Sequence, residues 1–323
     1  MSPLISVIVP VYNGADTITA TVESILAQTY EKLEVICVND GSQDNTAAVL
    51  AALAEKYPRV TFINKPNEGV TRARLDGVKA AKGEYIGFVD ADDLLDSDMY
   101  ERLMSNVLQH GADISHCGYR LIFHDGITYF YNTKELRIQN TQKGVLDLLE
   151  GTKVEPGLWN KLFRRELFQV FFNESSIMDY SIRNNEDLLM NYVLFKQADT
   201  SVFEDFCPYQ YIVRSSSASK GAINEHKLLD PAKAARIIYE DCCNELKATA
   251  ANLYVTKLTY AATYYGQGAD TIKAFRTGAQ KELRNFIFTF LSYDVGVKKK
   301  LLTVLAAFCP KLYHRIHTLY RNK

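Results

Sequence analysis

The start of the chain combines a buried strand, a polar turn and an amphipathic helix. Residues 4–11 are almost all apolar and rich in β-branched side chains, which is typical of a strand buried on both faces of a parallel sheet. Turn residues follow at 12–14, and Asp16 or Thr17 is placed to cap the next helix. The apolar positions of that helix share one face: Ile18, Val22, Ile25 and Leu26. The chain therefore opens with the first half of a βαβ unit.

The same pattern returns before residue 95. Strands are predicted at 33–38, at 60–63 and from Tyr85 toward Asp90, with helices between them. Four strands that alternate with three helices imply an α/β protein with a doubly wound, mostly parallel, Rossmann-like sheet and right-handed crossovers.

The alternation loosens beyond residue 95. We expect a helix over 97–110, a hairpin of 114–123 and 127–131 that turns at Asp125-Gly126, and a helix near 143–149.

A change of composition near residue 215 suggests a domain boundary. A strand predicted at 208–213 leads into the polar run 215–221, whose composition suits either a linker or a mobile lid. The sequence from 224 to 291 contains little Gly or Pro and is predicted to be helical. We therefore predict an α/β domain at 1–215 and a helical C-terminal region at 216–323.

The overall composition is that of an ordinary folded protein. Hydrophobic residues make up 47% and charged residues 23% of the 323 positions, and the net charge of -1 provides no global field that would favour nucleic acid as a partner. The six cysteines are scattered without C-x-x-C pairing, as in proteins of a reducing compartment. No secretory leader or membrane-spanning segment is predicted, so the expected location is the cytoplasm.

Polar clusters follow three of the predicted strands at their carboxyl ends. These clusters are Tyr12-Asn13-Gly14, Asp40-Gly41-Ser42 and Asp90-Ala91-Asp92-Asp93. Ligands of doubly wound sheets bind outside the carboxyl ends of the strands, so we expect the clusters to share one cleft. The alternative, that each cluster is only a turn, leaves their common placement to coincidence.

The third cluster has the residue types of a divalent cation site. Asp90 and Asp92 are two positions apart on an extended segment, so their carboxylates point the same way. Carboxylate oxygens are hard ligands that suit Mg2+ or Mn2+ when substrate phosphates hold the ion as well. A solvated acidic turn or a helix cap is the alternative for these residues.

Two candidates in the second half have both a structural and a functional interpretation. Trp159, the single tryptophan, is either a platform for the apolar face of a sugar or part of the core. Glu186 and Asp187 begin a predicted helix capped by Asn185, where the helix dipole favours acidic residues even without a function.

Taken together, these motifs resemble the family 2 glycosyltransferases of the GT-A fold. The resemblance is dense through ISVIVPVYN, VNDGSQDNT and NEGVTRARLDGVKAAKGEYIGFVDADD, and it continues more thinly through WNKLFRREL and NEDLL to Arg214. It identifies 1–215 as a catalytic domain, whereas the helical region after it has no counterpart in the family pattern.

The resemblance implies a nucleotide-sugar donor, most often UDP-linked, bound across the N-terminal half. Pro10, Val11, Tyr12 and Asp40 match positions that cradle the base and ribose, and Arg74 looks like an arginine that helps to bind the nucleotide. Asp90-Ala91-Asp92 matches the DxD motif, with Asp92 as the direct metal ligand and Asp90 nearer the ribose and metal.

NED resembles the acceptor-side xED motif, which makes Asp187 the expected catalytic base beside Glu186. Asn185 stands where many relatives carry Gly or another small residue, and Asp179 is the nearest rival for the role.

These assignments predict an inverting displacement. The metal ion neutralises the departing pyrophosphate, and Asp187 accepts the proton of the attacking hydroxyl. Charge and placement make Arg214 or Lys220 candidates for closing over the diphosphate.

Two other functions remain open at this stage. A sugar nucleotidyltransferase also needs carboxylates and a metal, but it would be expected to carry a Gly-rich basic loop after the first strand, and residues 12–16 contain no Lys or Arg. A non-catalytic nucleotide- or glycan-binding module is the other alternative.

The C-terminal tail, 298–323, combines a short apolar run with basic and aromatic residues. This composition suits a helix lying on an anionic membrane surface, and a packing helix with a basic solvated face is the alternative. With the family resemblance, it leads us to expect a glycan or lipid-linked glycan acceptor in surface polysaccharide synthesis, and peripheral contact with the inner face of the cell membrane.

Overall fold

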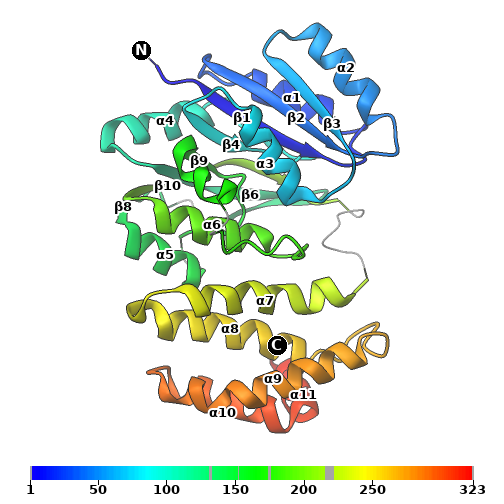
Figure 1. Cartoon of the computed structure of the whole chain (residues 1–323), viewed down its shortest axis with the longest axis vertical. Coiled ribbons are helices and arrows are strands. Elements are labelled where there is room, and N and C mark those ends of the chain that lie inside the picture. Colours follow the sequence, from blue (N-terminus) through cyan, green and yellow to red (C-terminus); the bar gives the residue numbers. More distant parts are fainter. Residues whose placement is uncertain (1, 131–132, 152, 174–175, 215–221, 322–323) are drawn as a thin grey trace. The chain divides into compact units, whose positions relative to one another are not determined.

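The chain forms an α/β unit and a helical unit. The computed structural model (Figure 1) describes residues 2–130, 133–151, 153–173, 176–214 and 222–321. The first compact unit is Met1–Met178 with Met190–Ser215, and the second is Asp179–Leu189 with Ser216–Lys323. The segment Asp179–Leu189, which the sequence placed in the first region, thus groups with the helical unit. One reason is that the backbone N–H of Arg183 donates a 2.8 Å hydrogen bond to the buried carboxylate of Asp230.

A single sheet underlies the first unit. Its strands are β1 (Ile5–Val11), β2 (Leu33–Asp40), β3 (Val60–Lys65), β4 (Tyr85–Phe88), β5 (Leu94–Leu95), β6 (Ile114–Phe123), β7 (Gly126–Phe130), β8 (Leu136–Asn140), β9 (Lys161–Arg164) and β10 (Thr200–Ile212). Their order is β3-β2-β1-β4-β9-β6-β10-β5, with β7 paired to β6 and β8 to β10. Strands β1 to β4 are parallel, so their carboxyl ends lie at the same edge. β9 runs antiparallel between β4 and β6.

Helices pack on both faces of the parallel strands. The helices of this unit are α1 (Ile18–Leu26), α2 (Thr46–Lys56), α3 (Val70–Ala80), α4 (Met99–His110), α5 (Thr141–Glu150), the 3-10 helix η1 (Arg165–Phe172) and α6 (Glu186–Gln197), through which the unit boundary passes. Val7 and Val9 of β1 share a core with Ile25 of α1. Ile8 faces the opposite side, where a Cβ added to Gly77 of α3 would lie 2.4 Å from its Cγ2. Packing on both faces confirms the doubly wound fold.

Three features of the first unit differ from the predictions. The hairpin turn lies at His124-Asp125, one residue earlier than predicted, because Gly126 already belongs to β7. Strand β10 begins at Thr200 rather than near 208. Asp205 interrupts the apolar pattern of this segment in the sequence. In the structure its buried carboxylate accepts backbone and side-chain hydrogen bonds, so the strand continues through it. Strands β8 and β9 were missed, because each is too short to show a clear alternation.

Helices make up nearly all of the second unit. They are α7 (Glu225–Asp241), the 3-10 helix η3 (Asn244–Leu246), α8 (Lys247–Ala262), α9 (Lys273–Ser292), α10 (Val297–Phe308) and α11 (Pro310–Arg321). Leu228, Leu258 and Leu283, from three different helices, share its core. Pro310 begins α11, a position that suits proline because the first N–H of a helix has no intrahelical partner. In the described part of the chain, no helix has the length and apolar character that crossing a membrane requires.

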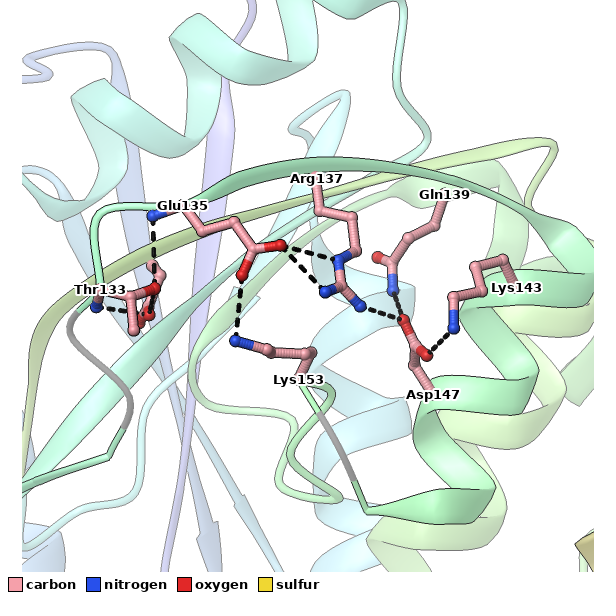
Figure 2. A network of polar contacts seen from close by, with 8 residues as sticks. Thr133, Glu135, Arg137, Gln139, Lys143, Asp147 and Lys153 are labelled. Atoms are coloured by element: carbon pink, nitrogen blue, oxygen red, sulfur yellow. Dashed lines mark hydrogen bonds and ion pairs between the residues drawn. The ribbon is translucent and has the colours of Figure 1, made fainter.

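A polar network fastens β8 to α5 (Figure 2). The buried carboxylate of Asp147 accepts hydrogen bonds from Gln139 Nε2 and Lys143 Nζ, both at 2.6 Å. Gln139 Oε1 in turn accepts a hydrogen bond from Nε2 of His116 in β6 at 3.0 Å. Burial, helped by the nearby charge of Lys161, lowers the pKa of His116 to about 3. The imidazole is therefore neutral in the folded protein at physiological pH.

His116 makes the stability of the first unit sensitive to acid. Its pKa in the folded state lies below the usual value of 6.5, so the unfolded chain takes up a proton first as the pH falls. The stabilisation is complete above pH 6.5 and is lost progressively toward pH 3. We expect the free energy of unfolding to fall by about 2 kcal/mol more in the wild type than in His116→Gln between pH 7 and pH 5, measured by urea denaturation. His124→Gln, at an exposed histidine, is the control and should behave like the wild type. Equal pH dependence in wild type and His116→Gln would contradict this account.

Candidate active site

The loops after β1 and β2 are held together by hydrogen bonds. The backbone N–H of Asn13 donates to Ser42 Oγ at 2.8 Å, and that of Gln43 donates to Asn13 Oδ1 at 2.8 Å. Asn13 adopts a left-handed φ of 52°, which its short polar side chain tolerates. The first two predicted polar clusters therefore adjoin. Tyr12 remains 50% exposed at this edge, while the side chains of Pro10 and Val11 are buried in β1.

Asp40, at the end of β2, organises the loop that leads to α3. Its Oδ1 accepts a hydrogen bond from the backbone N–H of Glu68 and its Oδ2 from that of Gly69, both at 2.9 Å. Lys65 Nζ lies 3.5 Å from the same carboxylate. The side chain is buried and its oxygens are bound within the protein, so Asp40 acts here by fixing the start of α3.

Helix α3 carries Arg74 to the carboxyl end of β4. The guanidinium is buried, and its Nη2 lies 3.4 Å from Oδ1 of Asp90. The second and third polar clusters are thus connected through α3, because Asp40 fixes the start of the helix and Arg74 reaches the acidic loop. The sequence had predicted a common cleft for these clusters, and the structure brings their residues to one edge of the sheet.

Asp90 and Asp92 form a pair of like charges in the acidic loop. Burial raises the pKa of the Asp92 carboxyl, and the negative charge of Asp90 raises it further. Arg214, just beyond β10, opposes this shift: its Nη1 lies 3.3 Å from Asp92 Oδ2 and also donates to the Asp92 backbone oxygen. The Asp92 side chain is 46% exposed and accessible to a ligand.

This pair fits a divalent cation that is shared with a substrate. Both side chains offer hard oxygen donors, and a bound cation would offset the repulsion that raises the pKa of Asp92. Among the residues whose placement is described, no group of three or more His, Cys, Asp or Glu side chains is arranged to hold a metal ion. Mg2+ is usually held by one or two carboxylates together with substrate phosphates and water.

Asp93, the third acid of the loop, is turned into the core. Its Oδ2 accepts a hydrogen bond from Tyr209 Oη at 2.8 Å, and its Oδ1 accepts one from the backbone N–H of Ile212 at 2.9 Å. Burial, together with the charge of Asp90, raises the pKa of Asp93 to about 8. This carboxyl joins the acidic loop to the end of β10, two residues before Arg214. Sequence reasoning missed the role, because a DxDD run does not show which acid faces inward.

Trp159 belongs to the core. The indole is only 8% exposed, stacks on Tyr209 with ring centroids 4.3 Å apart, and meets the Tyr119 ring edge-on at 4.8 Å. Of the two interpretations of this residue, the structure supports core packing, because a sugar platform needs an open ring face.

Glu186 and Asp187 lie in the first turn of α6, in the part that groups with the second unit. The backbone N–H of Leu188 donates to Asp187 Oδ1 at 2.8 Å. Burial lowers the pKa of Lys257 in α8, and the negative charge of Asp187 opposes that shift. Asp187 therefore interacts electrostatically with Lys257 of α8, within the second unit. Lys220 lies outside the described residues.

Comparison with solved structures identifies the fold. The crystal structure of S. aureus TarS 1-349 in complex with UDP-GlcNAc aligns with a TM-score of 0.71 over 99% of this chain and 92% of that chain, at 19% sequence identity. This likeness, together with the mostly parallel sheet, shows that the chain has the GT-A fold.

Sequence comparison identifies the family. The model for glycosyl transferase family 2 matches residues 6–172. The glycosyltransferase EpsJ of Bacillus subtilis is 34% identical over 233 residues, which are 70% of this chain and 67% of EpsJ. The glycosyltransferase GlyG of Streptococcus pneumoniae is 37% identical over 191 residues, which are 55% of this chain and 63% of GlyG. The chain belongs to glycosyl transferase family 2, as its motifs predicted, and is a glycosyltransferase.

Proposed function

We propose that this glycosyltransferase moves a sugar from a UDP-linked donor to a hydroxyl of a glycan or lipid-linked glycan, with inversion at the anomeric carbon. The observation that carries the proposal is the Asp90–Asp92 pair at the carboxyl end of β4, flanked by Arg74 and Arg214. Two carboxylates between two guanidinium groups suit a substrate that brings both a diphosphate and a metal ion. The UDP-GlcNAc complex of the structurally similar TarS supports the choice of nucleotide.

In this proposal, the exposed ring of Tyr12 stacks on the base, and Arg74 and Arg214 bind the nucleotide and its phosphates. Arg214 is suited to this role because its partner in the structure, Asp92, is the proposed metal ligand. When donor and cation bind, the guanidinium can exchange the carboxylate for a diphosphate oxygen. Lys220, in the polar segment after Arg214, is assigned to the same function by charge and sequence position.

Asp92 and Asp90 would hold the ion, Mn2+ or Mg2+, which supplies positive charge to the leaving diphosphate. Asp187 acts as general base for the acceptor hydroxyl. Its place in the NED motif and in the first turn of α6 supports this role.

A donor screen tests the proposal. UDP-, GDP- and dTDP-sugars are added to the protein with and without Mn2+, and thermal stabilisation is measured. We expect one UDP-sugar to stabilise the chain only when the cation is present. Stabilisation by a GDP- or dTDP-sugar alone would overturn the choice of nucleotide, and no response to any donor would indicate a module that has lost donor binding.

We further propose that the tail, 298–323, holds the enzyme at an anionic membrane. The tail has basic residues but no Asp or Glu. Its helices α10 and α11 expose large apolar side chains, among them Leu301, Phe308 and Leu319. Exposed apolar groups beside basic ones suit insertion at an anionic lipid surface.

Replacing the exposed apolar residues of the tail should release the protein from vesicles. We expect the triple variant Leu301→Gln, Phe308→Gln, Leu319→Gln to lose sedimentation with phosphatidylglycerol-containing vesicles, because each change removes apolar area that inserts into lipid. Phe288→Gln, at an exposed position of α9 outside the tail, is the matched control. Unchanged sedimentation of the triple variant, or equal binding of the wild type to neutral vesicles, would contradict the proposal.

A further inference from the structure

The second unit contains a cavity that the transfer reaction does not use. It has a volume of about 590 Å³ and is lined by residues of α8, of the turn that follows it and of α11. This volume lies in the usual range of small-molecule sites, roughly 300–1,000 Å³. The cavity is therefore large enough for a ligand of one or two sugar rings.

Threonine hydroxyls supply much of its polar lining. Thr256, Thr263 and Thr318 each donate to the backbone oxygen four residues earlier, at 2.6, 2.7 and 2.9 Å. This is the usual way in which a helical threonine satisfies its hydroxyl. Thr263 and Thr318 keep lone pairs that can accept a further hydrogen bond, whereas Thr256 Oγ1 already accepts one from Lys299 Nζ at 2.7 Å.

Thr259 departs from this pattern. Its side chain lines the same cavity and the residue is only 8% exposed, yet within the described residues its Oγ1 has no hydrogen-bond partner. A buried hydroxyl without a partner costs stability, so such groups are normally satisfied by protein, water or ligand. A molecule bound in the cavity is one source of the missing partner.

Aromatic rings supply the rest of the lining. Tyr313 and His317 stack with ring centroids 5.8 Å apart, and Tyr260 meets Tyr264 edge-on at 5.7 Å. In the described part of this unit, no Asp, Glu, Lys or Arg is among the residues lining the cavity. Ring faces beside neutral hydroxyls suit a ligand that is apolar on its C–H faces, rich in hydroxyl groups and uncharged.

We propose that this cavity is a binding site for a neutral saccharide of one or two rings. Its C–H faces pack on the tyrosine rings, and its hydroxyls bond to the threonine side chains, including Thr259. All the lining residues belong to the second unit, whereas the proposed donor site belongs to the first. Binding here depends neither on a nucleotide nor on transfer, so this proposal and the proposed function can fail separately.

Saturation-transfer NMR on the full chain tests the proposal. The probes are lactose, maltose and N,N′-diacetylchitobiose at millimolar concentration, with excess UDP and Mg2+ present to occupy the donor site. We expect at least one disaccharide to receive saturation from the protein. Thr259→Val, which removes the hydroxyl but conserves volume, should weaken its affinity about 3- to 10-fold, and Tyr260→Ala should weaken it by a similar or larger factor.

The matched control is Thr277→Val, at an exposed threonine of α9 that also bonds back along its helix. It should bind like the wild type. The melting temperature of Thr259→Val should equal or exceed that of the wild type, which separates lost binding from misfolding. Absence of binding by all three disaccharides, or an affinity equal to that of the wild type in both pocket variants, would overturn the proposal.

Discussion

Asp187→Asn should lower the rate of sugar transfer about 1,000-fold and leave the affinity for the donor nearly unchanged. The amide has the shape of the carboxylate but cannot accept the proton of the acceptor hydroxyl, and a general base contributes about 100- to 10,000-fold. The donor contacts proposed here come from the first unit, whereas Asp187 groups with the second, so donor binding should survive the change. The measurement is steady-state transfer, together with donor-induced thermal stabilisation of the same variant.

Glu186→Gln is the control for Asp187→Asn, because it removes the neighbouring charge from the same helical turn. If both changes lower the rate equally, the effect comes from the start of α6 rather than from a base. If Asp187→Asn retains full activity, the role passes to Asp179. The pKa of Asp179 is lowered mainly by its hydrogen bond with Ser181, which favours the ionised carboxylate that a base requires.

Asp92→Asn should abolish the cation-dependent stabilisation by the donor and lower transfer by about 100- to 1,000-fold, the range lost when one stabiliser of transition-state charge is removed. Without donor, the variant should unfold near the temperature of the wild type. Burial and Asp90 already disfavour the ionised form of Asp92, so its neutral replacement relieves repulsion even as the contact with Arg214 weakens.

Asp125→Asn, which changes an exposed acid in the hairpin turn, is the matched control for Asp92→Asn. It should leave both stabilisation and transfer unchanged. A full Mn2+-dependent response to the donor in Asp92→Asn would exclude this carboxylate from the cation site. A large loss of stability without donor would instead assign Asp92 a structural role through Arg214.

The sequence predicted the parallel half of the fold well because its strands are buried on both faces. A strand such as residues 5–11 has to be almost continuously apolar, and the turns that follow such strands have to be polar. Both signals are local. The meeting of Asp40, Arg74 and Asp90 at one edge then follows from the parallel connection of β1 to β4.

The remainder depends on contacts between distant residues. Nothing near Asp93 in the chain indicates that Tyr209 and Ile212 will hold its carboxylate. The burial of Trp159 likewise comes from tyrosines on β6 and β10. The grouping of Asp187 with the helical unit was missed for the same reason, since its neighbour Lys257 lies in a region that the family motifs do not reach.

The most direct test of the central claim is NMR of the donor during its cleavage in the presence of Mg2+, with water as the acceptor. We expect UDP to be released, together with a free sugar whose first-formed anomer has the configuration opposite to that of the donor, and both signals should disappear in Asp187→Asn. Release of UMP and sugar 1-phosphate, retention of the anomeric configuration, or a bound donor that is never cleaved would contradict the account.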